Sequence, residues 1–219
     1  MSTLISAPVA PLLARLFTEA DSALSPALTA VSPEERQRLL GSRSEYRRLY
    51  GELLKDLWLP VSPETGRLLY LLARSSGARS IVEFGTSFGI SSIHLAAALR
   101  DNGGGRLITT EFEPEKARRA AGHLREAGLD DLVEIRLGDA LETLAVDLPD
   151  AIDLVLLDGA KVLYDDVLDL LHERLRPGAL VIADNADDSP RYQQRMRSGN
   201  AGYLSVPFAD DVELSVRLA

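Results

Sequence analysis

The chain has 219 residues, which is enough for one sizeable hydrophobic core but not for two ordinary domains. Its 46% hydrophobic and 26% charged residues are usual for a globular protein, and its formal net charge of −9 argues against a general binder of nucleic acids or anionic membranes. The absence of cysteine excludes disulfides, thiolate metal sites and a cysteine nucleophile, and suits a reducing compartment.

Residues 1–60 are expected to form a helical extension, because apolar residues recur at helical spacing between prolines such as Pro33 and Pro60. The N-terminal stretch has neither the basic start nor the long apolar run of a signal peptide or membrane span, so we expect a cytoplasmic protein. Amphipathic helices of this kind are typical of packing on a core or on a partner subunit, and a homodimer is the expected assembly. Alternatively, they form a substrate lid, with Tyr50 or Trp58 lining the substrate pocket.

A second unit is expected over residues 61–219, with the boundary near Val61. Its first helix has Ser62 as the N-cap and proline in the first turn, and ends at Gly77. From Ser80 onward, apolar strands alternate with helical stretches. The predicted strands are 80–85, 106–111, 133–138, 152–158 and 179–185, and the predicted helices are 90–100, 115–127, 141–145 and 163–175.

Continuous apolar strands separated by helices indicate a parallel sheet that is covered on both faces. The C-terminal stretches 202–208 and 212–218 differ, because a short turn joins them and predicts an antiparallel hairpin. Five parallel strands followed by such a hairpin form the Rossmann-like α/β sheet of the class I methyltransferases. This is the fold that we predict, with the N-terminal helices as an extension.

The first strand leads into a glycine turn, SIVEFGTSFG, which precedes a helix and would let a nucleotide-like cofactor approach bare backbone. Gly85 and Gly89 are four residues apart and position 87 is serine, so the G-x-G-x-x-G pattern of dinucleotide binding is absent. Glu83 would repel a diphosphate but suits an α-ammonium group such as that of S-adenosylmethionine. The alternative is an ordinary strand-to-helix turn.

Acidic residues also end the next two strands. The Glu111 carboxylate, at the tip of the second strand, is suited to accept hydrogen bonds from both hydroxyls of a ribose. Asp139, after the third strand, is placed to accept a hydrogen bond from the amino group of an adenine. Each acid alone would also suit a helix cap, but their succession at the carboxyl ends of strands favours a cofactor site.

Asp158 ends the fourth strand, and Asp184 and Asn185 end the fifth. One strand–helix–strand crossover joins the two, so we expect these ends to be neighbours at the same edge of the sheet. Three oxygen ligands without His or Cys favour Mg²⁺, with Mn²⁺ or Ca²⁺ as alternatives. The alternative role for both acids is helix capping.

Lys161 follows Asp158 by three residues and is expected on the loop above the ion. A divalent cation and a sulfonium centre would favour the neutral form of this lysine, which makes it a candidate general base. The alternative is a surface lysine at a helix start.

The span from about Val61 to Ala219 resembles the small metal-dependent O-methyltransferases, the catechol and caffeoyl-CoA O-methyltransferase family in its bacterial type. The matching stretches are VEFGTSFGISS, TTEFEPEKA, GDALE, LVLLDGAKVLY and LRPGALVIADN. DGAK is closer to the caffeoyl-CoA and bacterial branch than to the animal catechol enzymes. The loop after Asn185 lacks the family's usual substrate insertion, and the acid that orients the second hydroxyl of a catechol has no clear counterpart.

The resemblance implies S-adenosylmethionine as the methyl donor. By the same match, Asp158, Asp184 and Asn185 would hold Mg²⁺, and Lys161 would be the base, with Asp158 also catalytic. The donor site would be lined by Val61, Glu83, Gly85, Thr86, Ser87, Gly89, Ser91, Glu111, Phe112, Asp139, Ala140 and Asp158.

The predicted function is the Mg²⁺-dependent transfer of a methyl group to a hydroxyl of a small catechol-like aromatic or natural-product acceptor. No nucleic acid partner and no membrane partner are expected. Two alternatives stay open, which are a metal-independent small-molecule methyltransferase and an inactive cofactor-binding partner protein.

Overall fold

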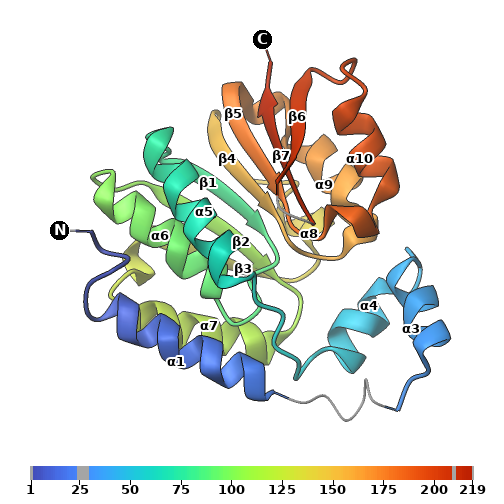
Figure 1. Cartoon of the computed structure of the whole chain (residues 1–219), viewed down its shortest axis with the longest axis horizontal. Coiled ribbons are helices and arrows are strands. Elements are labelled where there is room, and N and C mark those ends of the chain that lie inside the picture. Colours follow the sequence, from blue (N-terminus) through green and yellow to red (C-terminus); the bar gives the residue numbers. More distant parts are fainter. Residues whose placement is uncertain (1, 24–29, 209–210, 219) are drawn as a thin grey trace.

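The computed structural model describes residues 2–23, 30–208 and 211–218, and these form a seven-stranded sheet with helices on both faces (Figure 1). The strand order is β3-β2-β1-β4-β5-β7-β6. Strands β1 to β5 pair in parallel, whereas β7 pairs antiparallel with both β5 and β6. The strands are β1 (Ser80–Phe84), β2 (Arg106–Glu111), β3 (Val133–Leu137), β4 (Ile152–Leu157), β5 (Leu175–Ala183), β6 (Tyr203–Phe208) and β7 (Val212–Arg217). The predicted sheet is confirmed.

The helices follow the predicted alternation from residue 61 onward. They are α5 (Pro63–Ser75), α6 (Ile90–Asp101), α7 (Pro114–Ala127), α8 (Ala140–Thr143), α9 (Tyr164–Leu171) and α10 (Pro190–Arg197). Short 3-10 turns lie between them at η2 (Asp130–Leu132), η3 (Lys161–Leu163), η4 (His172–Arg174) and η5 (Ala186–Asp188). The predicted helix 163–175 is shorter than expected, because η4 breaks it and β5 begins four residues earlier than predicted.

The N-terminal extension is less regular than its apolar spacing suggests. It contains α1 (Val9–Ser22), α3 (Pro33–Leu40) and α4 (Tyr46–Arg48), which continues as the π-helix η1 (Leu49–Leu53). Part of the predicted helical stretch, residues 24–29, lies outside the described residues, as do hairpin residues 209–210. The last helical segment of the extension ends at Leu53, several residues before Pro60.

Capping residues set the helix starts that the sequence predicts. The Ser62 hydroxyl accepts a hydrogen bond from the Thr65 backbone N–H at 3.0 Å, and proline follows it in the first turn of α5. The carboxylate of Glu113 caps α7 in the same way by accepting from the Lys116 N–H at 2.7 Å. Both helices thereby begin at the carboxyl edge of the sheet with a fixed entry angle.

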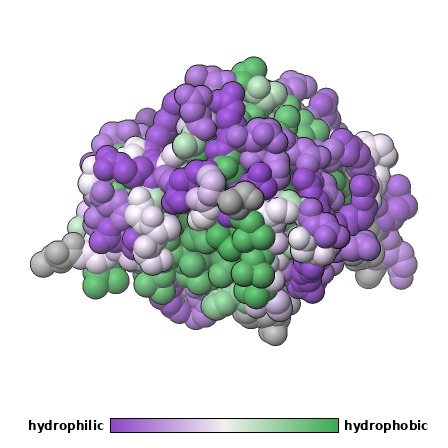
Figure 2. Space-filling view, turned by 90° about the horizontal axis from the view of Figure 1, so that it is seen from above, coloured by the Kyte–Doolittle hydropathy of each residue, from purple (hydrophilic) through white to green (hydrophobic). Residues whose placement is uncertain are grey.

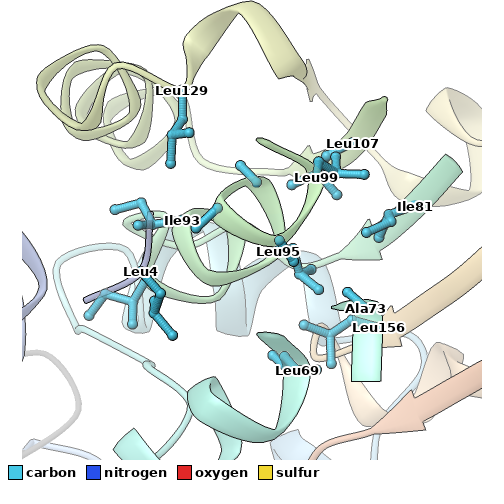
Figure 3. Packing of buried hydrophobic residues seen from close by; sticks show 14 of the residues in the cluster. Leu4, Leu69, Ala73, Ile81, Ile93, Leu95, Leu99, Leu107, Leu129 and Leu156 are labelled. Atoms are coloured by element: carbon cyan, nitrogen blue, oxygen red, sulfur yellow. The ribbon is translucent and has the colours of Figure 1, made fainter. Parts of the chain in front are cut away.

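Helix α6 lies at the centre of the larger hydrophobic cluster, and its residues from Ile90 to Leu99 are all buried. Figure 3 shows Ile93, Leu95 and Leu99 of this helix among side chains from α5, β1 and β2. Helices α5, α6 and α7 cover this face of the sheet, whereas α8, α9 and α10 pack on the other face through a second cluster. The glycine turn before α6 is therefore held by the most buried helix of the protein.

Helix α1 packs within its own chain. Its apolar residues Leu12, Leu13 and Leu16 join the cluster of α6, and α1 contacts both α6 and α7. Helix α3 and η1 instead form a small cluster around Leu39 and Leu49. In Figure 1, α3 and α4 lie apart from α1, below the C-terminal half of the sheet. The division of the chain at residue 60 stays a prediction.

The exposed apolar side chains lie elsewhere. Leu204, Val206 and Phe208 share one face of the edge strand β6, and each is more than 40% exposed. Figure 2 shows that apolar side chains also gather in one area of a surface that is otherwise polar. In the described ranges, no helix combines the length and hydropathy that crossing a bilayer requires. The predicted homodimer stays a prediction, and the buried face of α1 does not supply its interface.

The central position of α6 predicts a large effect of shortening one of its side chains. Leu95→Ala should lower the free energy of unfolding by about 2–5 kcal/mol, because Leu95 is fully buried and its neighbours are held by the sheet. Leu71→Ala makes the same change at a side chain that is 61% exposed, and should cost less than about 1 kcal/mol. Urea denaturation measures both variants, and equal losses would contradict this packing.

Candidate active site

The pairing of β4 with β5 brings two carboxylates together. Leu157 and Ala183 are register partners, so Asp158 and Asp184, which follow them, leave the sheet side by side. The Asp184 N–H donates to the Leu157 carbonyl at 2.9 Å, and the Asp158 N–H donates to the Phe84 carbonyl at 2.8 Å. The convergence expected from the sequence is therefore present in the structure.

Lys161 and Tyr164 connect these acids. The lysine Nζ lies 3.0 Å from Asp158 Oδ1 and 2.9 Å from the Tyr164 hydroxyl, and only 11% of its side chain is exposed. The Tyr164 hydroxyl in turn donates to the backbone carbonyl of Asp184 at 2.7 Å. The Ser189 hydroxyl donates to the Lys161 carbonyl at 2.9 Å, which holds η3 against the loop after β5.

The charges in this network are unevenly satisfied. Burial and the charge of Asp158 raise the pKa of Asp184 to about 7. Burial alone would lower the pKa of Lys161, but Asp158, Tyr50 and Asp184 together raise it above its ordinary value. The sequence analysis expected a neutral lysine beside a divalent cation and a sulfonium centre, and that expectation stays a prediction.

Asn185 has an unusual backbone for a residue with a side chain. Its φ of 48° lies in the left-handed region, which is uncommon outside glycine and is enriched for asparagine. Its amide donates to Asp211 Oδ2 at 3.3 Å, and the next residue, Ala186, donates its N–H to the Asp211 carbonyl at 2.7 Å. Asp211, which the sequence did not single out, thus orients the end of β5.

The donor set suits a hard cation. Asp158, Asp184 and Asn185 offer carboxylate and amide oxygens, which are ligands typical of Mg²⁺, and a divalent cation would relieve the repulsion that raises the pKa of Asp184. Across the described residues, no three His, Cys, Asp or Glu side chains gather as ligands of one metal ion. The expected ligand set contains only two carboxylates, those of Asp158 and Asp184. Its fit to a divalent cation therefore depends on the amide oxygen of Asn185 and on the negative charge that Lys161 does not compensate.

A cavity of about 470 Å³ opens beside the carboxylates. Its walls come from the strand ends, from the start of α5 and from the N-terminal helices, including Phe17, Leu40, Tyr50 and Leu54. Val61 lies in the wall of this cavity, and its expected role at the donor site stays a prediction. The alternative in which the extension is a lid with Tyr50 in the pocket wall agrees with this arrangement, whereas Trp58 stacks on Phe88 at 4.2 Å.

The glycine turn forms the floor of a second, adjacent cleft. Gly85 has a φ of 105°, and a Cβ there would lie 2.5 Å from the Asp158 carbonyl oxygen, so only glycine fits. Gly89 begins α6 with a φ of 88°. The residues of the turn that line this cleft or its small extension are Gly85, Thr86, Ser87 and Ser91. The close approach of backbone that the sequence predicts is therefore available here.

Glu111 lies in the wall of the same cleft. Its carboxylate accepts hydrogen bonds from the backbone N–H of Ser87 at 2.7 Å and from that of Glu113 at 2.9 Å. Burial raises its pKa. Phe112 and Ala140 also line the cleft, together with Lys116, which the sequence did not indicate because its helix reads as an exposed charged one. Glu111 thus has fixed oxygens that face a partly apolar cleft.

Glu83 is not in the cleft wall. It lies fully buried beneath the turn, where the Ser92 hydroxyl donates to its Oε2, and its Oε1 has no partner among the described residues. Burial raises the pKa of Glu83 to about 7. Ser91, in contrast, lines the open space beside the turn.

Asp139 is covered by the N-terminal extension. Its Oδ1 accepts from the Leu141 N–H at 3.0 Å, which caps α8, and its Oδ2 accepts from the Tyr46 hydroxyl and from Arg47 at 2.6 Å. Gly51 lies so close to the Phe112 ring that a Cβ there would come within 2.9 Å of it. We call residues 46–53 the cover segment. Under it the cleft holds only about 70 Å³, far below the roughly 300–1,000 Å³ of most ligand pockets.

The cleft and the larger cavity meet at one place. Asp158 and Gly159 line both, and Tyr50 and Leu59 of the extension lie over both. A ligand in the cleft and a ligand in the cavity would therefore approach one another beside Lys161. Tyr50 and Tyr164 carry no local sequence pattern that marks them, since their positions depend on how the extension and α9 pack.

Part of the chain is similar in sequence to known proteins. Residues 82–186 match the family model described as a methyltransferase domain. Over 134 residues the chain is 38% identical to a catechol O-methyltransferase of Niastella koreensis, and the match covers 58% of each chain. The match to a second catechol O-methyltransferase, from Mycobacterium tuberculosis, is 35% identical and covers 57% of that protein. The chain thus matches a little under three fifths of the length of these curated relatives.

Solved structures extend the likeness to nearly the whole chain. The cofactor-bound protein Rv0187 from MTB has a TM-score of 0.70 at 26% identity, with 98% of this chain and 94% of that chain covered. The O-methyltransferase TomG from Streptomyces achromogenes, in complex with SAM, has a TM-score of 0.67 at 29% identity, with coverage of 93% and 95%. The likeness therefore includes the N-terminal extension as well as the sheet.

The raised pKa of Asp184 predicts a pH-dependent stability of the metal-free protein. Asp184 would keep its proton up to about pH 7 in the folded state but only to about 3.8 when unfolded, so its contribution to stability is present at low pH and is lost as the pH rises from about 4 to 7. The stability of Asp184→Asn relative to the wild type should therefore rise between pH 4.5 and pH 8, by on the order of 2 kcal/mol.

Urea denaturation with a chelator at both pH values measures this difference. Asp130→Asn, at an exposed aspartate just before β3 at the opposite edge of the sheet, is the matched control and should change the free energy of unfolding by the same amount at both pH values. An Asp184→Asn effect of the same size at pH 4.5 and pH 8 would show that this carboxylate is not held in a repulsive, buried environment.

Proposed function

We propose, for this member of the class I O-methyltransferase family in its bacterial type, the transfer of a methyl group from S-adenosylmethionine to a hydroxyl of a small catechol-like acceptor. The observation that carries the proposal is the meeting of two spaces at Asp158 and Gly159. One is the cleft over the glycine turn, and the other is a larger cavity lined by carboxylates. A donor and an acceptor need such a common wall to react.

The cleft residues would bind the donor by their chemistry. Glu111, oriented by two backbone N–H groups, would accept hydrogen bonds from the ribose hydroxyls. Asp139 would accept a hydrogen bond from the adenine amino group once Tyr46 and Arg47 no longer contact it. Ser91 is placed to contact the methionine end, with the buried charge of Glu83 behind it. SAM-bound TomG supports a donor of this kind.

Asp158, Asp184 and Asn185 would hold a divalent cation, with Mg²⁺ as the first choice. A cation held there would supply Lewis acidity, which lowers the pKa of an acceptor hydroxyl beside Lys161. Asp211 would orient the amide of Asn185, and Tyr164 would fix the Asp184 backbone. The two catechol O-methyltransferases that the chain resembles support an acceptor with two neighbouring hydroxyls.

Lys161 would take the proton of the attacking hydroxyl. Its pairing with Asp158 now favours the ammonium form, so the base function requires that Asp158 turns its charge to the cation instead. The acceptor oxygen then bonds to the methyl carbon as the carbon–sulfur bond breaks, and the hydroxyl proton goes to the lysine Nζ. Asp158 would thus serve both as a ligand of the cation and as the ion-pair partner of Lys161.

The same ion pair supports a second candidate function. Asp158 and Lys161 form a buried ion pair at 3.0 Å, an arrangement that a metal-independent methyltransferase for small molecules would also use. In that case Asp158 would hold and orient the lysine throughout the reaction. The response to chelation separates the two candidates.

Activity measurements on a vicinal diphenol test the principal proposal. Lys161→Met and Asp184→Asn should each lower kcat at least about 100-fold, because one removes the base and the other a cation ligand. A chelator should abolish wild-type activity, and Mg²⁺ should restore it. Lys55→Met, at an exposed lysine, is the control and should keep wild-type activity. Full activity in the Lys161 and Asp184 variants would refute the mechanism, and activity that ignores chelation would leave only the metal-independent candidate.

The cover segment predicts an unusual gain of affinity. Arg47→Ala removes an ion pair that holds Asp139, so a larger fraction of the protein would have an open cleft, and S-adenosylhomocysteine should bind about three- to tenfold more tightly. Arg48→Ala removes a neighbouring arginine whose ion pair is with Glu45 within the extension, and should leave the affinity unchanged. Calorimetric titration measures both. Weaker binding by Arg47→Ala would mean that Arg47 contacts the donor instead of competing with it.

A further inference from the structure

Lys116 of helix α7 is a buried cation without a polar partner. It lines the cleft over the glycine turn and is only 3% exposed. Within the described residues, its ammonium group makes no hydrogen bond and no ion pair. The ammonium lies over the Phe88 ring, with Nζ 5.5 Å from the ring centre. A cation–π contact of this kind leaves the three N–H groups of the ammonium without acceptors.

The position is unfavourable for a lysine that serves stability alone. Burial lowers the pKa of Lys116, against the charges of Glu111, Glu113 and Asp56, which favour the ammonium form. Lys116 also lies in the first turn of α7, where the positive end of the helix dipole disfavours a cation. A buried ammonium at such a place is costly unless a ligand accepts its hydrogen bonds.

Glu111 supplies the complementary group in the wall of the same cleft. One of its carboxylate oxygens accepts from the Ser87 N–H and the other from the Glu113 N–H, and each keeps a further lone pair for a ligand. Its charge acts on Lys116 more strongly than any other, but the two side chains form no ion pair in the described part of the chain. A ligand hydroxyl fits between such groups, because it donates to a carboxylate and accepts from an ammonium at the same time.

We propose that Lys116 is a second ribose-binding residue of the donor cleft, whose ammonium donates a hydrogen bond to the oxygen of one ribose hydroxyl while that hydroxyl donates to Glu111. The inference rests on the proposed function, since it concerns the methyl donor. A carboxylate alone binds hydroxyls only through their protons. The pair also uses an oxygen lone pair, and thereby selects a donor with an intact ribose. Lys116 binds the donor in this way and takes no part in moving the proton of the acceptor.

Calorimetric titration with S-adenosylhomocysteine and with its 2′-deoxy and 3′-deoxy analogues tests the proposal. Lys116→Met removes the ammonium and keeps a flexible apolar side chain. It should weaken the binding of S-adenosylhomocysteine about 10- to 100-fold, as expected for a lost hydrogen bond to a charged group. For one of the two deoxy analogues it should cost less than about threefold, because the hydroxyl that Lys116 binds is already missing. Equal losses for all three ligands, or no loss for any, would overturn the proposal.

Arg118→Met is the matched control on the same helix. Arg118 is exposed and pairs with Glu115, so this variant removes the same charge away from the cleft and should leave all three affinities unchanged. Urea denaturation of Lys116→Met gives a second measurement. Its midpoint should equal or exceed that of the wild type, because the substitution removes a buried charge that no side chain compensates. A clear loss of stability would overturn the premise that the ammonium lacks a partner in the protein.

Two pH values separate a direct contact from an effect that acts through Glu111. Burial raises the pKa of Glu111 and the charge of Lys116 lowers it, so removing the ammonium favours the protonated carboxylate. The other acids of the cleft wall, Asp139 and Asp158, are present in both proteins. The direct hydrogen bond predicts that the loss of affinity persists from pH 6.5 to pH 8.5, because high pH favours the ionised carboxylate in both. A loss that disappears at pH 8.5 would overturn the direct contact.

The outcomes also separate this inference from the proposed function. Equal affinities of the wild type and Lys116→Met for S-adenosylhomocysteine would reject the role of Lys116 and leave the donor site in place. Failure of the wild type to bind S-adenosylhomocysteine at all would reject the donor itself, and both proposals with it.

Discussion

The structure depends on the register of β4 and β5, because this pairing forces two carboxylates into one buried place. Leu157 opposite Ala183 leaves Asp158 and Asp184 no other position. Burial and mutual repulsion are unfavourable for both, and a single lysine compensates only one of them. A fold that keeps such a pair at its sheet edge retains it for something other than stability. The proposed cation, the base and the acceptor all derive their chemistry from this uncompensated charge.

The two ends of the site treat their acids differently. In the donor cleft, the acids are satisfied by the protein itself, since Glu111 has two backbone N–H groups and Asp139 has an arginine and a tyrosine. In the acceptor cavity, Asp184 is left without such partners among the described residues. The cleft is therefore organised and closed, and the cavity is open and charged. The cover segment lies over the first, and carboxylates line the second.

Local patterns in the sequence predicted the sheet and the strand-end acids. Apolar runs, helix caps and the glycine turn depend on neighbours in the chain, so the strands from 80 onward and the adjacency of Asp158 and Asp184 could be derived from them. The position of the cover segment could not, because the contact of Arg47 with Asp139 joins residues 92 apart in the chain. For the same reason the sequence did not indicate that Val61 lines the larger cavity. The 3.0 Å contact of Lys161 with Asp158 could not be derived either, since no spacing in the sequence fixes it.

The most direct test of the central claim is to locate the cation. Crystals grown with Mn²⁺ and S-adenosylhomocysteine would be measured for anomalous scattering at the manganese edge. We expect one strong peak within bonding distance of Asp158, Asp184 and Asn185, with Lys161 released from Asp158 and the cover segment moved off Asp139. Bound S-adenosylhomocysteine with no manganese at these three residues would contradict the account, because the buried carboxylates would then be compensated by Lys161 alone.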